Sequence, residues 1–391
     1  MRNGKSKTAN IMVILGTRPE ATKLAPVILE LRRPAKQFNV KIIATGQHRE
    51  MLSQALGVFG LKPDINCDIM RREQSLEHIT SAALSRLDPI LGCERPDLVL
   101  VEGDATTVLA AALAAFYHHV AVAHLEAGLR TEERYNPFPE EMNRRLTSVL
   151  ASLHLAPTPG AKNNLLKEGH VEGSIYVTGN TAVDAVLWCA SQPPPDLPKT
   201  SHGAKVILVT THRRESWGEP LKRICETLAE IARRFSDTEI VFPVHPNPKV
   251  KGIVKEVLKG RQRIHLVKPM DYMSFVHMMK KSYIILSDSG GIQEEAPSLD
   301  KPVLVLRENT ERPEGLVAGT SKLVGTNTAK IVSEVRRLLC DEKAYASMAR
   351  ARNPFGDGRA AKRVREAILH YLGMRKRRPM EFKGVVRRKS D

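Results

Sequence analysis

Short runs of apolar, β-branched residues alternate with longer amphipathic stretches along almost the whole chain. This alternation is typical of βαβ units, in which helices join parallel strands and cover the sheet. The chain is therefore expected to be an α/β protein built on parallel sheets. The runs predict strands at residues 11–15, 40–44, 98–101, 120–125, 175–177, 205–210, 239–243, 264–267, 283–287 and 302–306.

A proline-rich stretch, residues 191–204, interrupts the alternation. It contains three consecutive prolines, Pro193–Pro195, and a fourth at Pro198. Proline continues neither a helix nor a central strand, so we predict a linker here, between α/β domains over residues 1–190 and 205–357. Because open parallel sheets bind ligands beyond the carboxyl ends of their strands, two facing domains would place a site in the cleft between them.

The net charge of +17 raises the question of a nucleic-acid or membrane partner. Much of this surplus lies after Gly358, where twelve basic residues accompany only three acidic ones. The rest of the chain has a surplus that suits an enzyme for small dianions and is modest for a protein that follows a phosphate backbone. Residues 374–391 have no apolar periodicity, and we expect them to form a basic, disordered tail.

The cysteines and the apolar runs indicate a cytoplasmic protein. The five cysteines are far apart and form no CxxC pair, which fits a reducing compartment and argues against a clustered metal site. No apolar run reaches the length of a membrane span, and the first run, residues 11–15, is too short for a secretion signal.

A basic turn follows the first predicted strand. Gly16 allows a tight turn, Pro19 suits the first turn of a helix, and Arg18 and Lys23 add positive charge. This pattern is typical of an anion site at a helix N-terminus, and an ordinary strand-to-helix turn has the same pattern.

Three carboxylates are expected at one edge of the first sheet. Asp104 follows a strand at a position where an aspartate either caps a helix or acts in catalysis. Glu126 follows the next strand, where a purely structural carboxylate has no obvious role. Glu140 opens a helix after a proline-rich loop, a position that the helix dipole also favours. If they meet, the three carboxylates form a proton-transfer set.

The second half of the chain has its own candidates at strand ends. His212 is either catalytic or an ordinary surface histidine. Ser289 and Gly290 open a helix and give the strongest local signal for phosphate binding, since a capped helix N-terminus presents several amide donors. Glu295, about one turn later, is placed to accept hydrogen bonds from ribose hydroxyls, and Arg312 is a further candidate cation.

From about Ile11 to Leu372 the chain resembles the non-hydrolysing UDP-N-acetylglucosamine 2-epimerases of bacteria. The segments that carry the resemblance are, in order, GTRPEATKLAP, TGQHREML, HLEAGLRT, PFPEEMNRRLT, VTGNTAVDA, THRRESWG, SDSGGIQEEAPSLDKPVLVLR and TERPEG. The family has two Rossmann-like domains, similar to those of glycosyltransferases and glycogen phosphorylase. The resemblance also implies that a helix over residues 358–373 returns to the N-terminal domain.

The resemblance implies a reversible epimerisation of UDP-GlcNAc to UDP-ManNAc, which supplies ManNAc-type sugars for surface polysaccharide. UDP is eliminated to leave a 2-acetamidoglucal, and UDP adds back after C2 is protonated on the other face. The resemblance implies a homodimer and neither a nicotinamide cofactor nor a metal.

The resemblance also implies a role for each residue that matches a family motif. Asp104, Glu126 and Glu140 would be the acid/base carboxylates, and His212 would lie near the departing diphosphate. Glu295 would hold the ribose. The UDP-sugar would be bound by Arg18, Lys23, Phe275, Ser289, Gly290, Glu295 and Arg312.

Two positions of the expected active site depart from the family's pattern. The family commonly has histidine where this chain has Glu102, whose negative charge is expected to raise the pKa of the adjacent Asp104. Met270 replaces a glutamine that some relatives have near the position of Phe275, which bears on the contact with uracil.

A further departure concerns regulation. Some relatives bind a second UDP-GlcNAc as an activator through a Gln-x-x-Gln segment, where this chain has Gln47-His48-Arg49-Glu50. These relatives also use a later arginine at the activator site, and Glu73 replaces part of that set of residues here. If this activation exists here, Gln47 and His48 are the candidate allosteric contacts.

Three alternatives remain open from the sequence. A hydrolysing epimerase would release ManNAc and UDP, although GTRPE together with TERPE favours the non-hydrolysing branch. A two-domain glycosyltransferase would use a UDP-sugar without needing three carboxylates. The third alternative is a non-enzymatic protein that binds nucleic acid or a membrane surface through its basic tail. We expect no nucleic-acid partner and only weak contact of the tail with a membrane surface. Deletion after Leu372 is expected to leave turnover intact.

Overall fold

The computed structural model describes residues 8–33, 37–46, 49–71, 74–131, 133–213 and 216–384, with only the backbone for residues 49–51. The chain forms two compact units. The first runs to Ala185 and also contains Gly356–Gly384, and the second is Val186–Phe355.

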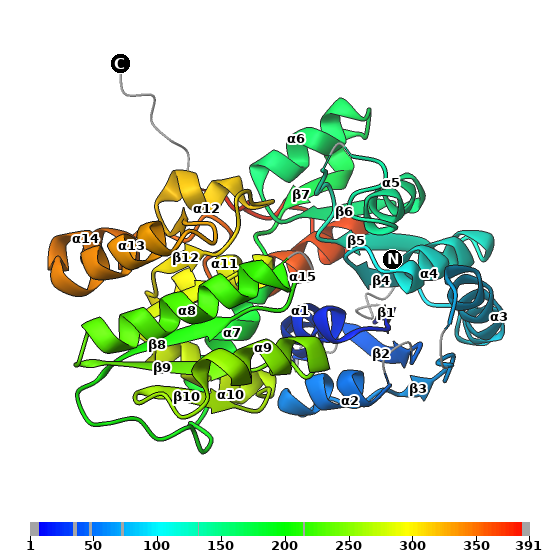
Figure 1. Ribbon diagram of the computed structural model, residues 1–391. Coiled ribbons are helices and arrows are strands. Elements are labelled where there is room, and N and C mark those ends of the chain that lie inside the picture. Colours follow the sequence, from blue (N-terminus) through cyan, green and yellow to red (C-terminus); the bar gives the residue numbers. More distant parts are fainter. Residues whose placement is uncertain are drawn as a thin grey trace, which may run out of the picture. The chain divides into compact units, whose positions relative to one another are not determined.

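The first unit is built on a seven-stranded parallel sheet (Figure 1). Its strands are β1 Ala9–Leu15, β2 Phe38–Ala44, β3 Ile65–Asn66, β4 Leu98–Glu102, β5 Ala121–Leu125, β6 Leu153–Ala156 and β7 Ile175–Val177. Its helices are α1 Arg18–Leu31, α2 Arg49–Val58, α3 Leu76–Glu94, α4 Thr106–Tyr117, α5 Glu140–Leu150, α6 Pro159–Lys167, the short helix η1 Glu172–Ser174 and α15 Ala360–Tyr371, and α7 Thr181–Ser191 spans the division between the units.

The strand order of this sheet reverses between β1 and β4. The order is β3-β2-β1-β4-β5-β6-β7, so the chain builds outward from β1 in one direction and then from β4 in the other. The loops that leave β1 and β4 therefore run to opposite faces of the sheet and open a crevice at their carboxyl ends, where such sheets bind ligands. The residues after β1, β4 and β5 are those that the sequence predicts to be functional.

Apolar side chains of both α3 and α4 cover one face of this sheet. Met12 of β1 and Val99 of β4 lie in one buried cluster with Leu87 of α3 and Ala111 of α4. On α15, the first two amides are capped by Asp184, whose carboxylate accepts from the backbone nitrogens of Ala360 and Ala361 at 3.1 and 2.9 Å. This cap satisfies donors that a helix N-terminus leaves open and ties α15 to α7.

The second unit is built on a six-stranded parallel sheet with the order β10-β9-β8-β11-β12-β13. Its strands are β8 Lys205–Thr210, β9 Thr238–Pro243, β10 Ile264–Val267, β11 Ile284–Ser287, β12 Val303–Val305 and β13 Ser321–Leu323. Its helices are α8 Glu219–Arg234, α9 Pro248–Leu258, α10 Tyr272–Lys281, α11 Gly290–Glu295, the short helix η3 Ala296–Leu299, α12 Pro313–Ala318, α13 Thr328–Cys340 and α14 Glu342–Ala349.

The helices of this unit are amphipathic. On α8, Leu221, Ile224, Leu228 and Ile231 recur at helical spacing, and all four are buried against the sheet. The strand order reverses between β8 and β11, so a second crevice opens at the carboxyl ends of these two strands. In the part of the chain that the structure describes, no helix is both long and apolar enough to cross a membrane.

The structure confirms the predicted α/β architecture and adds three strands. The predicted runs correspond to β1, β2, β4, β5, β7 and β8–β12. The strands β3, β6 and β13 were not predicted, because they have only two, four and three residues and lack a β-branched run. Pairing with a longer neighbour forms such strands where local propensity does not.

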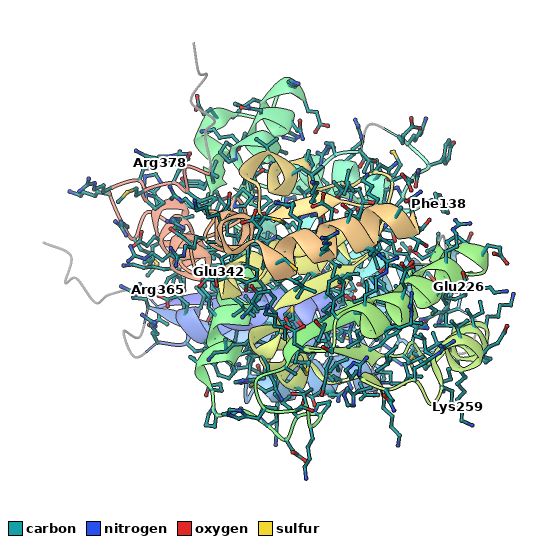
Figure 2. All side chains as sticks on the ribbon, turned by 60° about the vertical axis from the view of Figure 1, so that its left-hand side comes forward. Phe138, Glu226, Lys259, Glu342, Arg365 and Arg378 are labelled. Carbon is teal, nitrogen blue, oxygen red and sulfur yellow. The ribbon has the colours of Figure 1, made fainter. Side chains whose placement is uncertain are left out.

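The expectation of a disordered tail is wrong for residues 374–384. This segment packs along β7, the edge strand of the first sheet: the backbone nitrogen of Phe382 donates to Val177 O at 2.8 Å. Arg378, labelled in Figure 2, donates to Ile175 O, and its guanidinium carbon lies 4.1 Å from the centre of the Tyr176 ring. One buried aromatic residue and one arginine give no apolar periodicity, so the sequence pattern did not reveal this contact. Residues 385–391 lie outside the described residues.

The packed segment leads us to expect that truncation after Leu372 destabilises the first unit. Phe382 is only 3% exposed, and truncating a buried phenylalanine side chain to alanine costs about 3 kcal/mol. The truncation should lower the free energy of unfolding by at least that amount, because it also opens the edge of β7. Urea unfolding measures this. M380A is the matched control, because Met380 belongs to the same segment but is 78% exposed, and it should leave stability unchanged. Equal stability of M380A and the truncated protein would contradict the packing of Phe382.

Candidate active site

The turn after β1 brings three elements of the first unit close together. A Cβ atom on Gly16 would lie 2.5 Å from Thr45 Oγ1 and 2.7 Å from Thr107 Oγ1, so only glycine fits there. Glu20, on the first turn of α1, folds back onto this turn. Its carboxylate accepts from the Gly16 nitrogen at 2.9 Å and from Thr17 Oγ1 at 2.6 Å. The Gly-Thr-Arg-Pro-Glu turn is therefore held by its own glutamate.

Burial raises the pKa of Glu20 from 4.5 to about 7, and the charge of Asp104 adds to this rise. A carboxyl group whose pKa is raised on folding stabilises the fold below its unfolded pKa and loses that contribution as the pH rises through its folded pKa. The stability contributed by Glu20 should therefore fall by roughly 3 kcal/mol between pH 4.5 and pH 8.

This gives a test by substitution. Because E20Q cannot ionise, its free energy of unfolding relative to the wild type should rise across this pH range. The control is E77Q, since the Ser75 hydrogen bond lowers the pKa of Glu77 and moves its titration below the range. Urea unfolding at both pH values measures the difference, and a constant difference would show that Glu20 does not titrate near neutral pH.

Lys23 of α1 joins two carboxylates at the edge of the first sheet. It contacts Glu126, which follows β5, and its Nζ lies 3.2 Å from Oε1 of Glu102 at the end of β4. Glu126 has a φ of 65°, in the left-handed region that residues with a side chain rarely adopt. Such a conformation persists only where the surrounding structure imposes it, and it is frequent at functional sites.

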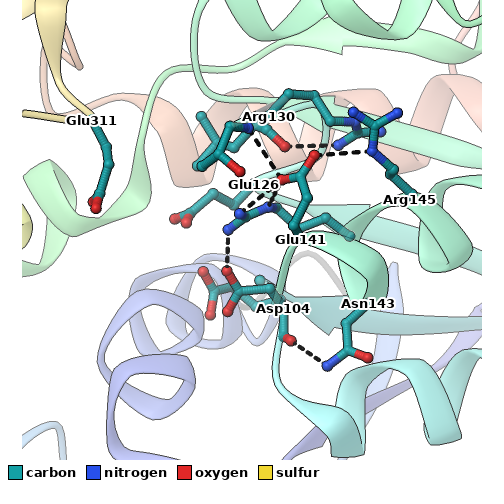
Figure 3. Close-up of polar contacts among 12 residues, drawn as sticks. Asp104, Glu126, Arg130, Glu141, Asn143, Arg145 and Glu311 are labelled. Carbon is teal, nitrogen blue, oxygen red and sulfur yellow. Dashed lines mark hydrogen bonds and ion pairs between the residues drawn. The ribbon is translucent and has the colours of Figure 1, made fainter. Parts of the chain in front are cut away.

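Asp104 follows Glu102 and Gly103, and α5 holds it in place (Figure 3). Arg144 donates to its carboxylate at 2.5 Å, and Asn143 donates to its backbone oxygen at 2.8 Å. Burial raises the pKa of Asp104, the charge of Arg144 lowers it, and the charge of Glu126 raises it again. The expected direction of this shift is confirmed, but its largest cause is burial rather than the charge of Glu102.

Glu140 belongs to the same group of charges, since its carboxylate also raises the pKa of Asp104. It is the first residue of α5, and its Oε2 is buried without a hydrogen-bond partner among the described residues. The neighbouring Glu141 has a structural role: it accepts from Arg144, from Arg145 at 2.9 Å and from the Thr131 nitrogen at 3.1 Å (Figure 3). The arginine that holds Asp104 is thus itself fixed.

A buried histidine fixes the turn that carries Asp104. His124 of β5 donates through Nε2 to the backbone oxygen of Gly103 at 2.8 Å, and Gly103 has a φ of 79° that suits only glycine. Burial lowers the pKa of His124 to about 4, so the ring is neutral at physiological pH. His124 is therefore a fixed donor in this site.

In the second unit, His212 and Asp288 meet at the reversal between β8 and β11. The fully buried Asp288 carboxylate lies 3.0 Å from Nδ1 of His212. It also accepts from the backbone nitrogens of His212 and Arg213 at 3.1 Å, and from Ser216 Oγ at 2.9 Å. Burial raises the pKa of Asp288, but these hydrogen bonds and the charge of His212 outweigh burial and keep the pKa below its usual value. An Nδ1 proton donated to Asp288 leaves Nε2 of the half-exposed ring as the reactive nitrogen.

Two arginines lie beside Gly290, which begins α11. A Cβ atom on Gly290 would be 3.8 Å from the guanidinium of Arg312 and 3.9 Å from that of Arg213. Arg312 donates to the buried Glu294, and Arg213 donates to Glu311 at 3.2 Å. Both guanidinium groups are thus oriented next to the amides that follow Ser289, an arrangement suited to a phosphate group.

The third part of this second site is formed by α10 and α11. The hydroxyl of Tyr272 donates to Oε1 of Glu295 at 3.2 Å. Phe275 lies one helical turn after Tyr272 and is half-buried. A carboxylate next to an aromatic ring is an arrangement that suits the ribose and base of a nucleoside.

The structure thus forms two groups from the predicted residues. In the first unit, electrostatic contacts join Asp104 to Lys23, Glu126 and Glu140, and the exposed Arg18 begins α1 on the same side of the sheet. The second unit holds His212, Phe275, Ser289, Gly290, Glu295 and Arg312. The candidate allosteric contacts Gln47 and His48 lie outside the described residues, and so does Glu73.

The residues that sequence analysis missed at these sites include Glu20, Arg144, Arg213 and Asp288. Asp288 had a usable signal, because a polar residue directly after a buried parallel strand lies at the ligand-binding edge. Glu20, Arg144 and Arg213 lie within segments that were singled out as motifs. Nothing in the segment of Arg144 indicates its partner Asp104, which is forty positions away.

Comparison with known proteins decides the family. The family model for UDP-N-acetylglucosamine 2-epimerase matches residues 30–369. A curated UDP-N-acetylglucosamine 2-epimerase from Yersinia pestis is 50% identical over 371 residues, which are 92% of this chain and 98% of the relative. The chain belongs to the UDP-N-acetylglucosamine 2-epimerase family. The predicted family resemblance is thereby confirmed.

Solved structures agree with this membership. The crystal structure of UDP-GlcNAc 2-epimerase from Neisseria meningitidis bound to UDP-GlcNAc has a TM-score of 0.83 and 46% sequence identity, covering 92% of this chain and 99% of that one. A more distant structure, the glycotransferase of kitacinnamycin, has a TM-score of 0.65 at 13% identity, with 94% and 100% of the two chains covered. That likeness concerns the fold alone and confirms the expected similarity to glycosyltransferases.

Proposed function

We propose that this member of the epimerase family converts UDP-GlcNAc to UDP-ManNAc reversibly, without hydrolysis. The observation that carries the proposal is the group formed by Asp104, Glu126 and Glu140, held by Lys23 and Arg144 at the strand reversal of the first unit. A hydrogen on C2 of a sugar is weakly acidic, so its removal needs a placed base, and its return on the other face needs an acid. The product would supply ManNAc-type sugars for surface polysaccharide.

The proposed reaction has two halves. In the first, a carboxylate takes the proton from C2 while the bond between C1 and the UDP oxygen breaks, which leaves a 2-acetamidoglucal and UDP. In the second, a carboxyl group delivers a proton to the opposite face of C2 and the UDP oxygen bonds to C1 again. Atoms and charge balance in this scheme. The scheme does not assign the three carboxylates to one face of C2 or the other.

The cations and amides of both units would bind the rest of the substrate. Negative charge grows on the leaving diphosphate, and positive groups that are already oriented stabilise it at little cost. Glu295 would accept from the ribose hydroxyls, and His212 would lie near the diphosphate. The residues proposed to bind the UDP-sugar are Arg18, Lys23, Phe275, Ser289, Gly290, Glu295 and Arg312.

Product analysis tests this proposal. Purified protein incubated with UDP-GlcNAc should yield UDP-ManNAc, and incubation with UDP-ManNAc should yield UDP-GlcNAc at the same final ratio. Anion-exchange chromatography separates the nucleotides, and NMR distinguishes the two sugars. Release of free ManNAc with UDP would instead assign the chain to the hydrolysing branch, and transfer of the sugar to an acceptor would assign it to the glycosyltransferases.

The proposed active form is a homodimer. Large apolar side chains are exposed at the C-terminal ends of α4 and α5: Tyr117 is 64% exposed and Val149 75%, with Phe116 and Leu146 beside them. Such a face is typical of a surface that another protein covers, and we propose a second copy of this chain as its occupant. V149R should convert the dimer to a monomer in light scattering, whereas V171R, on an exposed loop, should not.

A further inference from the structure

One ammonium group serves two carboxylates in the first unit. Lys23 contacts Glu126 and also lies 3.2 Å from Oε1 of Glu102. Glu102 is only 2% exposed, so its charge cannot be screened by solvent. If both glutamates are ionised, the three groups carry a net negative charge in a buried place, and that state is costly.

The groups around Glu102 all bear on its charge. Lys23 and Glu20 face it from α1, Asp104 from the turn after β4, and Glu126 from the turn after β5. Burial raises the pKa of Glu102 well above its usual value; the Lys23 charge opposes this rise, and the three other carboxylates add to it. These effects favour the neutral form of Glu102, and of the two glutamates Lys23 then pairs with Glu126.

We propose that Glu102 is a positioning residue that controls how the charge of Lys23 is divided between Glu126 and itself, and thereby sets the alkaline limit of turnover. When Glu102 is neutral, the full charge of Lys23 acts on Glu126 and on the diphosphate. When Glu102 loses its proton to water, it draws Lys23 toward itself and adds a negative charge to the site. The added negative charge weakens binding of the dianionic substrate. It also leaves Glu126 with a smaller share of the positive charge of Lys23, which changes the charge that Glu126 carries during turnover. This inference rests on the proposed function.

The pH dependence of kcat/KM tests it. E102Q retains the shape of the neutral carboxyl group but cannot ionise, so its activity should extend to higher pH. At the alkaline end of the wild-type profile E102Q should be roughly ten-fold more active than the wild type, which corresponds to a shift of about one pH unit. E102D retains a carboxyl group, so its activity should fall at high pH as that of the wild type does. If E102D and E102Q behave alike, packing rather than charge is responsible, and the inference is wrong.

Two controls separate this effect from others. E94Q removes the carboxylate of another lysine–glutamate pair in the same unit, in which Nζ of Lys41 lies 2.5 Å from Oε2 of Glu94. The pH profile of E94Q should match that of the wild type. E20Q removes a carboxylate that raises the pKa of Glu102, so its alkaline limit should move to lower pH, opposite to the change expected for E102Q. A shift to higher pH in E20Q as well as in E102Q would contradict a specific role for Glu102.

A measurement on the free protein keeps this inference separate from the proposed function. With 13C at the glutamate carboxyl carbons, the signal absent from E126Q identifies Glu126. In the wild type this signal should show an inflection where Glu102 ionises, at a pH well above the usual range of a glutamate, and in E102Q that inflection should be absent. An identical curve in both proteins would overturn the inference even if the enzyme is an epimerase. A wild-type protein that shows the inflection without epimerase activity would refute the proposed function alone.

Discussion

Replacing Glu126 by glutamine should lower kcat by about a thousand-fold or more while leaving the protein folded. Proton transfer by a positioned carboxyl group contributes a factor of 10² to 10⁴ to rate, and glutamine neither accepts nor donates the required proton. Glutamine has nearly the same shape and still accepts a hydrogen bond from Lys23, so the left-handed turn at this position should persist.

The matched control is E133Q, which changes an exposed glutamate on the loop between Glu126 and Glu140. Its kcat should equal that of the wild type. Because Glu126 is proposed to act on the reacting carbon, KM for UDP-GlcNAc should change far less than kcat in E126Q. Steady-state kinetics and a thermal melt measure these quantities. Activity of E126Q within ten-fold of the wild type would remove Glu126 from the proton-transfer set.

The second large effect is expected for the pair formed by His212 and Asp288. H212A should lower kcat by about a hundred-fold, since the ring would stabilise the departing diphosphate. D288N should have a similar effect, because an amide in place of the buried carboxylate no longer holds the Nδ1 proton and frees the ring to rotate. The double variant should lose little beyond H212A alone, since residues that act as one unit are not additive.

D288N will also lower stability, since the buried carboxylate accepts from two backbone nitrogens and from Ser216. A lost acceptor for a buried donor costs about 2 kcal/mol. D341A serves as the control, because Asp341 caps α14 by accepting from the backbone nitrogens of Lys343 and Ala344, away from this site. Loss of this cap should lower stability but leave kcat unchanged. Fully additive losses in the H212A and D288N double variant would show that Asp288 does not act through His212.

The sequence predicted the positions of the candidate catalytic groups better than it predicted which residues contact them. Asp104, Glu126 and His212 each follow a buried strand, and parallel strands bring their carboxyl ends to one edge, so local patterns suffice to place them. The partners Arg144 and Asp288 come from elements far along the chain. Only packing determines which residues meet across such distances.

The tail shows the same limit in another form. Its composition predicted disorder, yet residues 374–384 donate hydrogen bonds to backbone carbonyl groups of β7, and the side chain of Phe382 is buried. An edge strand attracts such a segment because its outer hydrogen-bonding groups are otherwise open. Which segment satisfies them depends on where α15 ends, and residue type alone does not reveal it.

The central claim is that carboxylates of the first unit move the proton on C2 of the sugar. Proton NMR of the protein with UDP-GlcNAc in deuterated water tests this most directly, because an acid that exchanges with solvent returns deuterium. The account predicts UDP-ManNAc with deuterium at C2, deuterium at C2 of recovered UDP-GlcNAc, and neither signal with E126Q. Formation of UDP-ManNAc that retains its original C2 proton, or no reaction at all, would contradict it.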